Sequence, residues 1–278
     1  MSASSVDPLQ RIAELPGVDA AVEQARTVVD RLLGHRVLRR RSADVSMESA
    51  LRGARASAVL EGADADVETL EHVRSGASGD PRVKGALRVS GELGILVETW
   101  PKAPLQALAR LHTLAAADAV PADRLGRPRA GGENGQGREG GESAVDPLGL
   151  GAAPAPAEVS ARLGALNSLL ATRSSVPALV VGAIVHGELA ALRPFGWGDG
   201  IIARAAERLT LIERGLDPKS LVPPELGHLE SGAEYGAALR GYLAATPEGV
   251  GTWVVYCCRA VEAGARDSLA TCEALKRG

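Results

Sequence analysis

Large aliphatic residues recur at helical spacing through most of the chain. Between residues 7 and 45 they fall every three or four positions, and this spacing predicts helix with an interruption at Pro16-Gly17. A second helical stretch is predicted over 46–75. It contains a break where Gly62 follows Glu61, because glycine ends helices well.

The second half of the chain carries the same periodicity. Residues 83–118 predict two helices that are separated at the prolines between 101 and 104. Residues 176–195 are apolar nearly all round, which predicts a central helix surrounded by others. An amphipathic helix is expected over 201–218, and two further helices between 224 and 278.

One segment breaks the pattern. Residues 125–157 are rich in glycine and proline and hold almost no large apolar side chain. Such a segment cannot bury enough surface to order itself, so it predicts a long flexible loop. Helix is expected to resume near Glu158, where aliphatic residues return at helical spacing.

Composition favours an all-α fold. Hydrophobic residues make up 45% of the 278 residues but aromatic residues only 3%, so alanine, leucine, valine and isoleucine must fill the core. The formal net charge of −3 gives no electrostatic case for nucleic-acid binding. The basic run His35–Arg41 is interpreted as a solvated helix end, with a role in binding nucleic acid or a partner as the alternative.

The cysteines and the apolar segments favour a cytoplasmic protein. Cys257, Cys258 and Cys272 are odd in number and fit no zinc spacing, so reduced core thiols are expected. No signal peptide is expected at the first residues, and no uncharged apolar stretch reaches the length of a membrane span. We therefore expect a soluble, cytoplasmic protein without a membrane partner.

The stretch LRPFGWGDGIIAR, residues 192–204, raises the question of chemistry. Glycine stands at 196, 198 and 200, between a buried helix and the next helix. A helix N-terminus presents unpaired N–H groups to an anion, and glycine lets a phosphate approach the backbone. The alternative is a tight connection between two core helices with no ligand.

The same stretch resembles the signature of the Fic/Doc (Fido) family, His-Pro-Phe-x-Asp/Glu-Gly-Asn-Gly-Arg-x-x-Arg. Pro194, Phe195, Gly198, Gly200 and Arg204 match it without a gap. Phe195 is the single phenylalanine of the chain, so its match is more specific than that of a leucine.

The resemblance extends beyond the motif. The stretch 107–118 is similar to the family's early Leu-His helix, and His186 stands where many members carry a histidine before the motif. The resemblance implies a Fido core over 90–245. It is preceded by an N-terminal helical region, 1–89, and followed by a C-terminal helix, 246–278.

The departures from the signature remove the implied chemistry. In the family, a histidine takes a proton from a target hydroxyl, but Arg193 stands there and has no acceptor lone pair. Trp197 replaces the acidic residue that holds Mg²⁺, and it offers no oxygen to a hard cation. Ile201 replaces the first motif arginine. We therefore expect no catalytic residue and no metal ligand in the motif.

Two alternatives remain for the loop. Arg193 and Arg204, over a glycine-lined helix start, could hold a phosphate or carboxylate, so ATP or another nucleotide stays open as a ligand without Mg²⁺. Alternatively Asp199, at the family's asparagine position, caps the helix and pairs with Arg193 or Arg204, which fills the pocket from within. His112 and His186 are the nearest replacement bases, against the alternative of satisfied core histidines.

A second signature lies upstream. SAVLEG, Ser57 to Gly62, resembles the inhibitory motif Ser/Thr-x-x-x-Glu-Gly/Asn that some family members carry on an N-terminal helix. The resemblance implies that Glu61 pairs with Arg204 and persists as a structural lock. The alternative is an exposed glutamate at a helix end.

Together these features predict a Fic-like protein with a degenerate AMP-transfer site, a pseudoenzyme that binds or regulates a protein partner. The resemblance places the family's target-docking flap in residues 125–157, with a long insertion that has no docking role as the alternative. The competing hypothesis is an active nucleotidyl or phosphoryl transferase with altered, metal-independent chemistry. A third hypothesis is a helical domain whose function is its interface.

Overall fold

The structure, a computed structural model, describes residues 7–129, 148–172 and 174–277. Within these ranges the chain forms helices joined by turns and loops and no strand, which confirms the all-α prediction there. In chain order the helices are α1 (Pro8–Ala13), α2 (Val18–Leu33), α3 (Leu38–Leu60), α4 (Leu70–Arg74), α5 (Pro81–Leu96), α6 (Pro104–Ala116), the short 3₁₀ helix η1 (Ala122–Arg124), α7 (Pro156–Ala171), α8 (Ala178–Leu192), α9 (Asp199–Glu213), α10 (Pro224–Glu230), α11 (Ala233–Leu243) and α12 (Pro247–Arg277).

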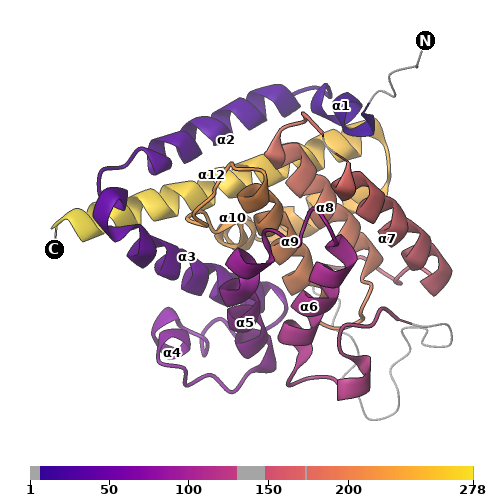
Figure 1. Cartoon of the computed structure of the whole chain (residues 1–278), viewed down its shortest axis with the longest axis horizontal. Coiled ribbons are helices and arrows are strands. Elements are labelled where there is room, and N and C mark those ends of the chain that lie inside the picture. Colours follow the sequence, from indigo (N-terminus) through magenta and orange to yellow (C-terminus); the bar gives the residue numbers. More distant parts are fainter. Residues whose placement is uncertain (1–6, 130–147, 173, 278) are drawn as a thin grey trace.

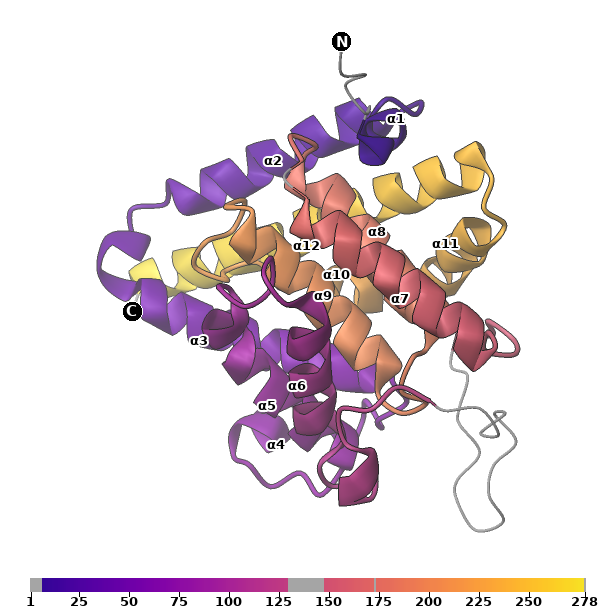
Figure 2. The same cartoon turned by 45° about the vertical axis from the view of Figure 1, so that its right-hand side comes forward.

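The other helices surround α8 and α9, two consecutive helices that pack against each other. Figure 1 shows the long α12 crossing the molecule with α2 beside it, and these two helices pack together. Helices α5 and α6 pack against α9 from the opposite side. Figure 2 shows α7 lying along α8, and α11 packs against α12.

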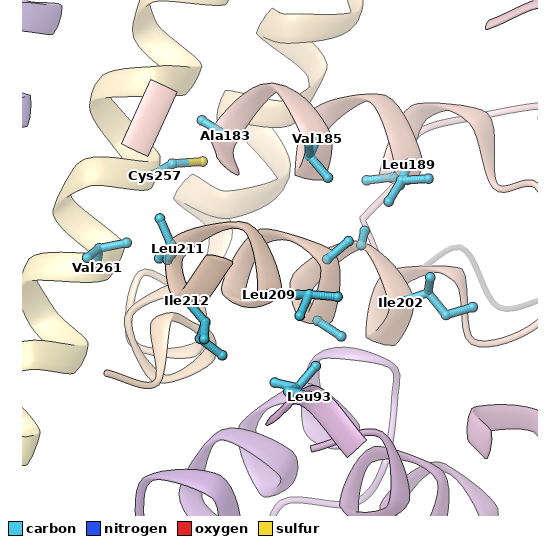
Figure 3. Packing of buried hydrophobic residues seen from close by; sticks show 14 of the residues in the cluster. Leu93, Ala183, Val185, Leu189, Ile202, Leu209, Leu211, Ile212, Cys257 and Val261 are labelled. Atoms are coloured by element: carbon cyan, nitrogen blue, oxygen red, sulfur yellow. The ribbon is translucent and has the colours of Figure 1, made fainter. Parts of the chain in front are cut away.

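The centre of the core confirms the expectation for 176–195. Helix α8 is apolar nearly all round, with His186 and Glu188 as its polar residues, and most of its side chains are buried. Figure 3 shows Val185 of α8 and Leu209 of α9 between Leu93 of α5 and Cys257 and Val261 of α12. Burying this pair of helices fixes the loop between them, because both ends of the loop are anchored in close-packed core.

The prediction of one helical stretch over 7–45 and a second over 46–75 is wrong in its bounds, because α3 continues from Leu38 through residue 45 to Leu60. Besides the predicted interruption near Pro16-Gly17, the chain breaks again after α2, where Gly34 follows Leu33. Glycine has a low helix propensity, and this second break lets α2 lie along α12 while α3 packs against α5. The basic run covers the turn before α3 and the first turn of that helix, where Arg39, Arg40 and Arg41 are exposed, which agrees with the expected solvated helix end.

The break predicted at Glu61-Gly62 is present. Helix α3 ends at Leu60, Glu61 is its C-cap, and Gly62 has a φ of +97°. Glycine takes that conformation without steric cost, whereas a residue with a Cβ does not. The turn that ends α3 therefore fixes the position of Glu61 at the surface of the core.

The loop predicted over 125–157 is only partly described. Residues 130–147 lie outside the described residues, whereas 125–129 and 148–155 lie against the helices. Helix α7 begins at Pro156, two residues before the expected start. Proline at the first position starts a helix well because it lacks only an N–H that would have no partner there.

The three cysteines are free and buried in α12, in agreement with the expected core thiols. No helix among the described residues has both the length and the apolar composition that crossing a bilayer requires.

Candidate functional site

The loop between α8 and α9 is a turn that leads into a helix, as its glycines predict. Helix α8 ends at Leu192, and Arg193 takes the left-handed conformation with a φ of 44°. Gly196 and Gly198 also have positive φ, 79° and 67°, and α9 begins directly after them. The backbone reversal thus requires the two glycines, while Arg193 accepts a conformation that costs an L-residue energy.

Asp199 fills the loop from within. Its Oδ1 accepts a hydrogen bond from the Phe195 N–H at 2.9 Å, and its Oδ2 accepts one from the Gly196 N–H at 2.7 Å. These two N–H groups are therefore not free to donate to another acceptor. Burial raises the pKa of Asp199 to about 7, while the same two N–H groups act to lower it.

The alternative in which Asp199 caps α9 and forms an ion pair is wrong in its details. Asp199 is the first helical residue, Gly198 is the N-cap, and no side chain caps the helix. Among the described residues, no ion pair joins the Asp199 carboxylate to Arg193 or Arg204. The carboxylate turns back into the loop instead, toward the Phe195 and Gly196 N–H groups.

Arg204 lies in the core one helical turn further on, and it is 1% exposed. Its Nε donates to the Ser57 Oγ at 2.9 Å, and its Nη2 donates to the Ser57 carbonyl oxygen at 2.9 Å. Nη2 also contacts the Glu61 Oε2 at 3.1 Å, which forms an ion pair. The pair inferred from the two sequence signatures is therefore present, and it joins the exit of α3 to α9.

Glu61 also lies against the first turn of α9. A Cβ added at Gly200 would collide with the Glu61 Oε2 and would crowd the Arg204 guanidinium. The Glu61 side chain keeps 19% of its surface exposed, so the pair lies at the edge of the core. The carboxylate thus occupies the helix start where a bound anion would be expected.

Arg129 is hydrogen-bonded to the backbone of the loop between α8 and α9. Its backbone N–H donates to the Pro194 carbonyl oxygen at 2.7 Å, and its Nε donates to that of Arg193 at 2.9 Å. The Nη1 of Arg193 donates to the Gly151 carbonyl oxygen at 2.7 Å. The sequence analysis missed Arg129, because nothing in its glycine- and proline-rich surroundings distinguishes it.

The hydrophobic positions of the motif are packed rather than presented to solvent. The ring of Phe195 is stacked on the imidazole of His112, with 4.3 Å between the ring centroids. The side chain of Ile201 is buried. The His112 Nδ1 accepts the Gly126 N–H at 2.9 Å. Burial, with a contribution from Arg124, lowers the pKa of His112 to about 4, so it is neutral at pH 7. Trp197 is half-buried and packs against the core.

His186 belongs to a buried polar network below the loop. Its Nδ1 contacts the Glu207 Oε2 at 2.7 Å, and its Nε2 contacts the Tyr235 hydroxyl at 2.8 Å. His228 Nε2 contacts the same Glu207 oxygen at 3.0 Å, and its Nδ1 contacts the Tyr256 hydroxyl at 3.2 Å. Both ring nitrogens of His186 thus have partners, so His186 is a satisfied core histidine, the alternative to a replacement base.

The charges of this network follow from its burial. Burial lowers the pKa of His186 to about 4 and raises that of Tyr235 to about 12, so both are neutral. Burial by itself would raise the pKa of Glu207, but the imidazoles that face it lower that pKa below its usual value. The Arg204 Nη1 donates to the Tyr235 hydroxyl at 3.4 Å, which connects the network to the Glu61–Arg204 pair.

Among the described residues, His186, Glu207 and His228 are the group with metal-ligating donor atoms within 4.8 Å of one another. Each donor atom already takes part in a hydrogen bond within the group, and the two tyrosines occupy the outer imidazole nitrogens. The arrangement is that of a closed hydrogen-bond network, in which each buried polar atom has its partner. No local sequence pattern unites these residues, because they come from α8, α9 and α10.

Comparison with known proteins agrees with this geometry. No protein-family model and no curated protein matches the sequence. Among solved structures, a Fic family protein from Desulfovibrio desulfuricans G20 is similar, with a TM-score of 0.69 and 22% identity over 90% of this chain and 74% of that chain. A fragment of Fic-1 from C. elegans is similar with a TM-score of 0.68 and 18% identity over 92% of this chain and 73% of that chain. The chain therefore has the all-α Fic fold.

Proposed function

We propose that this Fic-fold protein does not transfer AMP and instead acts by binding, as a pseudoenzyme with a regulatory role. One observation carries the proposal. Asp199 accepts the Phe195 and Gly196 N–H groups of the loop, and in the resemblance to the family signature Arg193, Trp197 and Ile201 replace the base, the metal ligand and the first arginine.

The chemistry supports this reading. A guanidinium has no acceptor lone pair and stays protonated, so Arg193 cannot accept the proton of a hydroxyl nucleophile. The side chain of Trp197 offers a hard cation no oxygen ligand. His112 and His186 are buried within packed or hydrogen-bonded surroundings, so neither supplies a replacement base at the loop.

The test is incubation of the full chain with ATP labelled at the α-phosphate, with and without Mg²⁺, followed by detection of label on protein. We expect no label with the wild type. We also expect none with Glu61→Gly, because releasing Arg204 restores neither a base nor a metal ligand. Label that disappears in Arg204→Ala would overturn the proposal and favour the metal-independent transferase.

Calorimetry separates transfer from binding in the same site. Titration with ATP and GTP, with and without Mg²⁺, is expected to show no dependence of binding on the metal. We expect any nucleotide binding to be tighter in Glu61→Gly, because the Glu61 carboxylate lies against the start of α9 and repels a phosphate. An Mg²⁺-dependent increase in affinity would contradict the absence of a metal ligand.

A further inference from the structure

A cavity is lined by α6, α7, the segment 126–129 and Phe195 of the α8–α9 loop. It encloses about 380 Å³, which falls in the range of about 300–1,000 Å³ that is typical of small-molecule sites. Most of its wall is apolar, with Leu105 and Leu108 from α6 and Leu163 from α7. The wall therefore suits a ligand with an apolar body.

The cavity is built into the fold by the close approach of the segment 126–129 to α6. Gly126 has a φ of +72°, and a Cβ added there would lie 3.0 Å from both the Ala109 carbonyl oxygen and the Thr113 Oγ1. Glycine takes this conformation and fits this close approach without strain. The Gly126 N–H also donates to the His112 Nδ1 at 2.9 Å. These contacts hold the wall in place before a ligand arrives.

The wall of the cavity adjoins a buried polar atom that has no partner. His112 is 1% exposed, and its Nδ1 accepts the Gly126 N–H, so the neutral ring carries its proton on Nε2. Among the described residues, nothing accepts a hydrogen bond from this Nε2. Gly126 and Phe195 both contact the His112 ring and both line the cavity. Hydrogen bonding is therefore incomplete at this end of the cavity, unlike in the network around Glu207.

The cavity also has an uncovered apolar side chain. Leu105, in the first turn of α6, lines the cavity and is 42% exposed. Val159 and Leu163, which line it from α7, are buried. Apolar surface in contact with water is unfavourable in proportion to its area. A ligand with an apolar body is therefore stabilised by covering Leu105.

Arg129 is the one charged side chain among the described residues that line the cavity. Its Nε and Nη2 donate to the carbonyl oxygens of Arg193, Pro154 and Leu192, which hold the guanidinium in place. A guanidinium has five N–H donors, and these bonds leave the two on Nη1 without a partner among the described residues. Because all three acceptors are neutral, the positive charge of Arg129 is not neutralised by these contacts.

We propose that this cavity binds a small amphipathic carboxylate with an unbranched alkyl chain. The alkyl chain lies against the apolar wall between Leu105 and Phe195, and the carboxylate faces Arg129. A single positive charge matches a monoanion, whereas a phosphate dianion would leave part of its charge without a partner. The inference goes beyond the proposed function, because it concerns a cavity next to the loop and holds whether or not AMP is transferred.

The first test is calorimetric titration of the full chain with hexanoate, octanoate and decanoate. We expect the affinity to rise about fourfold for each methylene that the cavity buries. Octan-1-ol has the same chain length without the charge, and we expect it to bind about tenfold more weakly than octanoate. Absence of binding, or an affinity that does not depend on chain length, would overturn the proposal. Equal affinity for octan-1-ol and octanoate would overturn the carboxylate as the ligand class.

Two matched pairs of exposed variants locate the site. Leu105→Ser removes apolar contact with the ligand and is expected to weaken octanoate binding about tenfold, whereas Ile95→Ser, at an exposed leucine-like side chain outside the cavity, should have no effect. Ser160→Phe places a ring at the exposed rim and should block binding, whereas Ala161→Phe, at the next exposed position outside the cavity, should not. Equal binding within both pairs would place the ligand elsewhere and overturn the proposal.

Arg129→Gln tests the recognition of charge. The variant is expected to bind octanoate about tenfold more weakly and octan-1-ol as tightly as the wild type does, because only the carboxylate needs the positive charge. An equal loss for both compounds would mean that Arg129 only holds the cavity wall in place, and would overturn its role in recognition.

A further measurement needs no variant. Phe195 is the single phenylalanine of the chain, so isotope-labelled phenylalanine gives NMR ring signals from one residue of the cavity wall. We expect these signals to shift during titration with octanoate and to saturate at the Kd found by calorimetry. Ring signals that do not move would overturn the proposal. Label transfer from ATP tests the proposed function separately, since it requires no carboxylate.

Discussion

Two polar regions lie on the same helix, α9, and are held together in different ways. At its start, Asp199 and Arg193 contact backbone groups, and the contact of Arg193 with the Gly151 carbonyl oxygen is exposed to solvent. Two turns further on, Glu207 contacts only side chains, and its partners His186 and His228 are completely buried. A contact in the loop can be removed without changing the others, whereas the members of the buried network depend on one another for their hydrogen bonds.

The difference predicts where a substitution costs the most stability. An exposed contact is replaced by water when a side chain changes, so its removal costs little. A buried polar atom has no water to replace a lost partner, so each member of the network constrains the others. Substitution of Arg193, whose contact with the Gly151 carbonyl oxygen is exposed, is therefore expected to cost less stability than substitution of Glu207.

The comparison predicts its largest effect at Glu207. Glu207→Gln leaves one carbonyl oxygen to face two imidazole nitrogens, and it removes the buried charge that they stabilise. We expect a loss of about 3–5 kcal/mol in the free energy of unfolding, measured by denaturant unfolding. The control is Glu213→Gln at the half-exposed end of the same helix, with an expected change below about 0.5 kcal/mol. Equal effects for the two variants would contradict the distinction.

The Glu61–Arg204 pair is expected to behave as an intermediate case. Arg204→Met removes a buried guanidinium from Ser57, Glu61 and Tyr235, and should cost about 3 kcal/mol or more. Glu61→Gln should cost about 1 kcal/mol, because its carboxylate is partly exposed. The double variant should cost less than the sum by about 0.5–3 kcal/mol. Additivity within about 0.3 kcal/mol would show that the pair contributes no coupling.

The loop carboxylate predicts a pH dependence that the buried network does not share. The pKa of Asp199 is about 7 in the folded chain and 3.8 as an ordinary value, so the folded state binds its proton more tightly. The stabilising contribution is therefore complete below pH 4 and is lost as the pH rises through 7. We expect the Tm of the wild type to fall from pH 5 to pH 8 relative to that of Asp199→Asn, measured by circular dichroism. Parallel pH profiles would contradict a raised pKa.

The smallest effect is expected from backbone strain at Arg193. Arg193→Gly and Arg193→Ala both remove the contact with the Gly151 carbonyl oxygen, but only glycine relieves the positive φ of 44°. The glycine variant should therefore be more stable than the alanine variant by about 1 kcal/mol, measured by thermal unfolding. Equal stabilities would mean that the left-handed conformation at this position is not strained.

The sequence by itself determined the helical architecture and the course of the loop. Apolar spacing marked α5, α6, α8 and α12, because a helix must bury one face or, for α8, all of them. Glycine spacing marked the turn before α9, because the positive φ values there require it. The two family-like signatures were enough to pair Glu61 with Arg204 across the fold.

The tertiary structure alone decided which polar atoms meet. Arg129, Tyr235, Glu207 and His228 carry no local pattern, and their contacts join residues that lie far apart in the chain. The orientation of Asp199 toward the loop rather than the helix likewise depended on which N–H groups the turn left unpaired. The spacing of apolar residues along a chain shows where a helix forms, because it follows the period of the helix. The partner of a buried polar atom is instead selected by the three-dimensional packing that removes water from both.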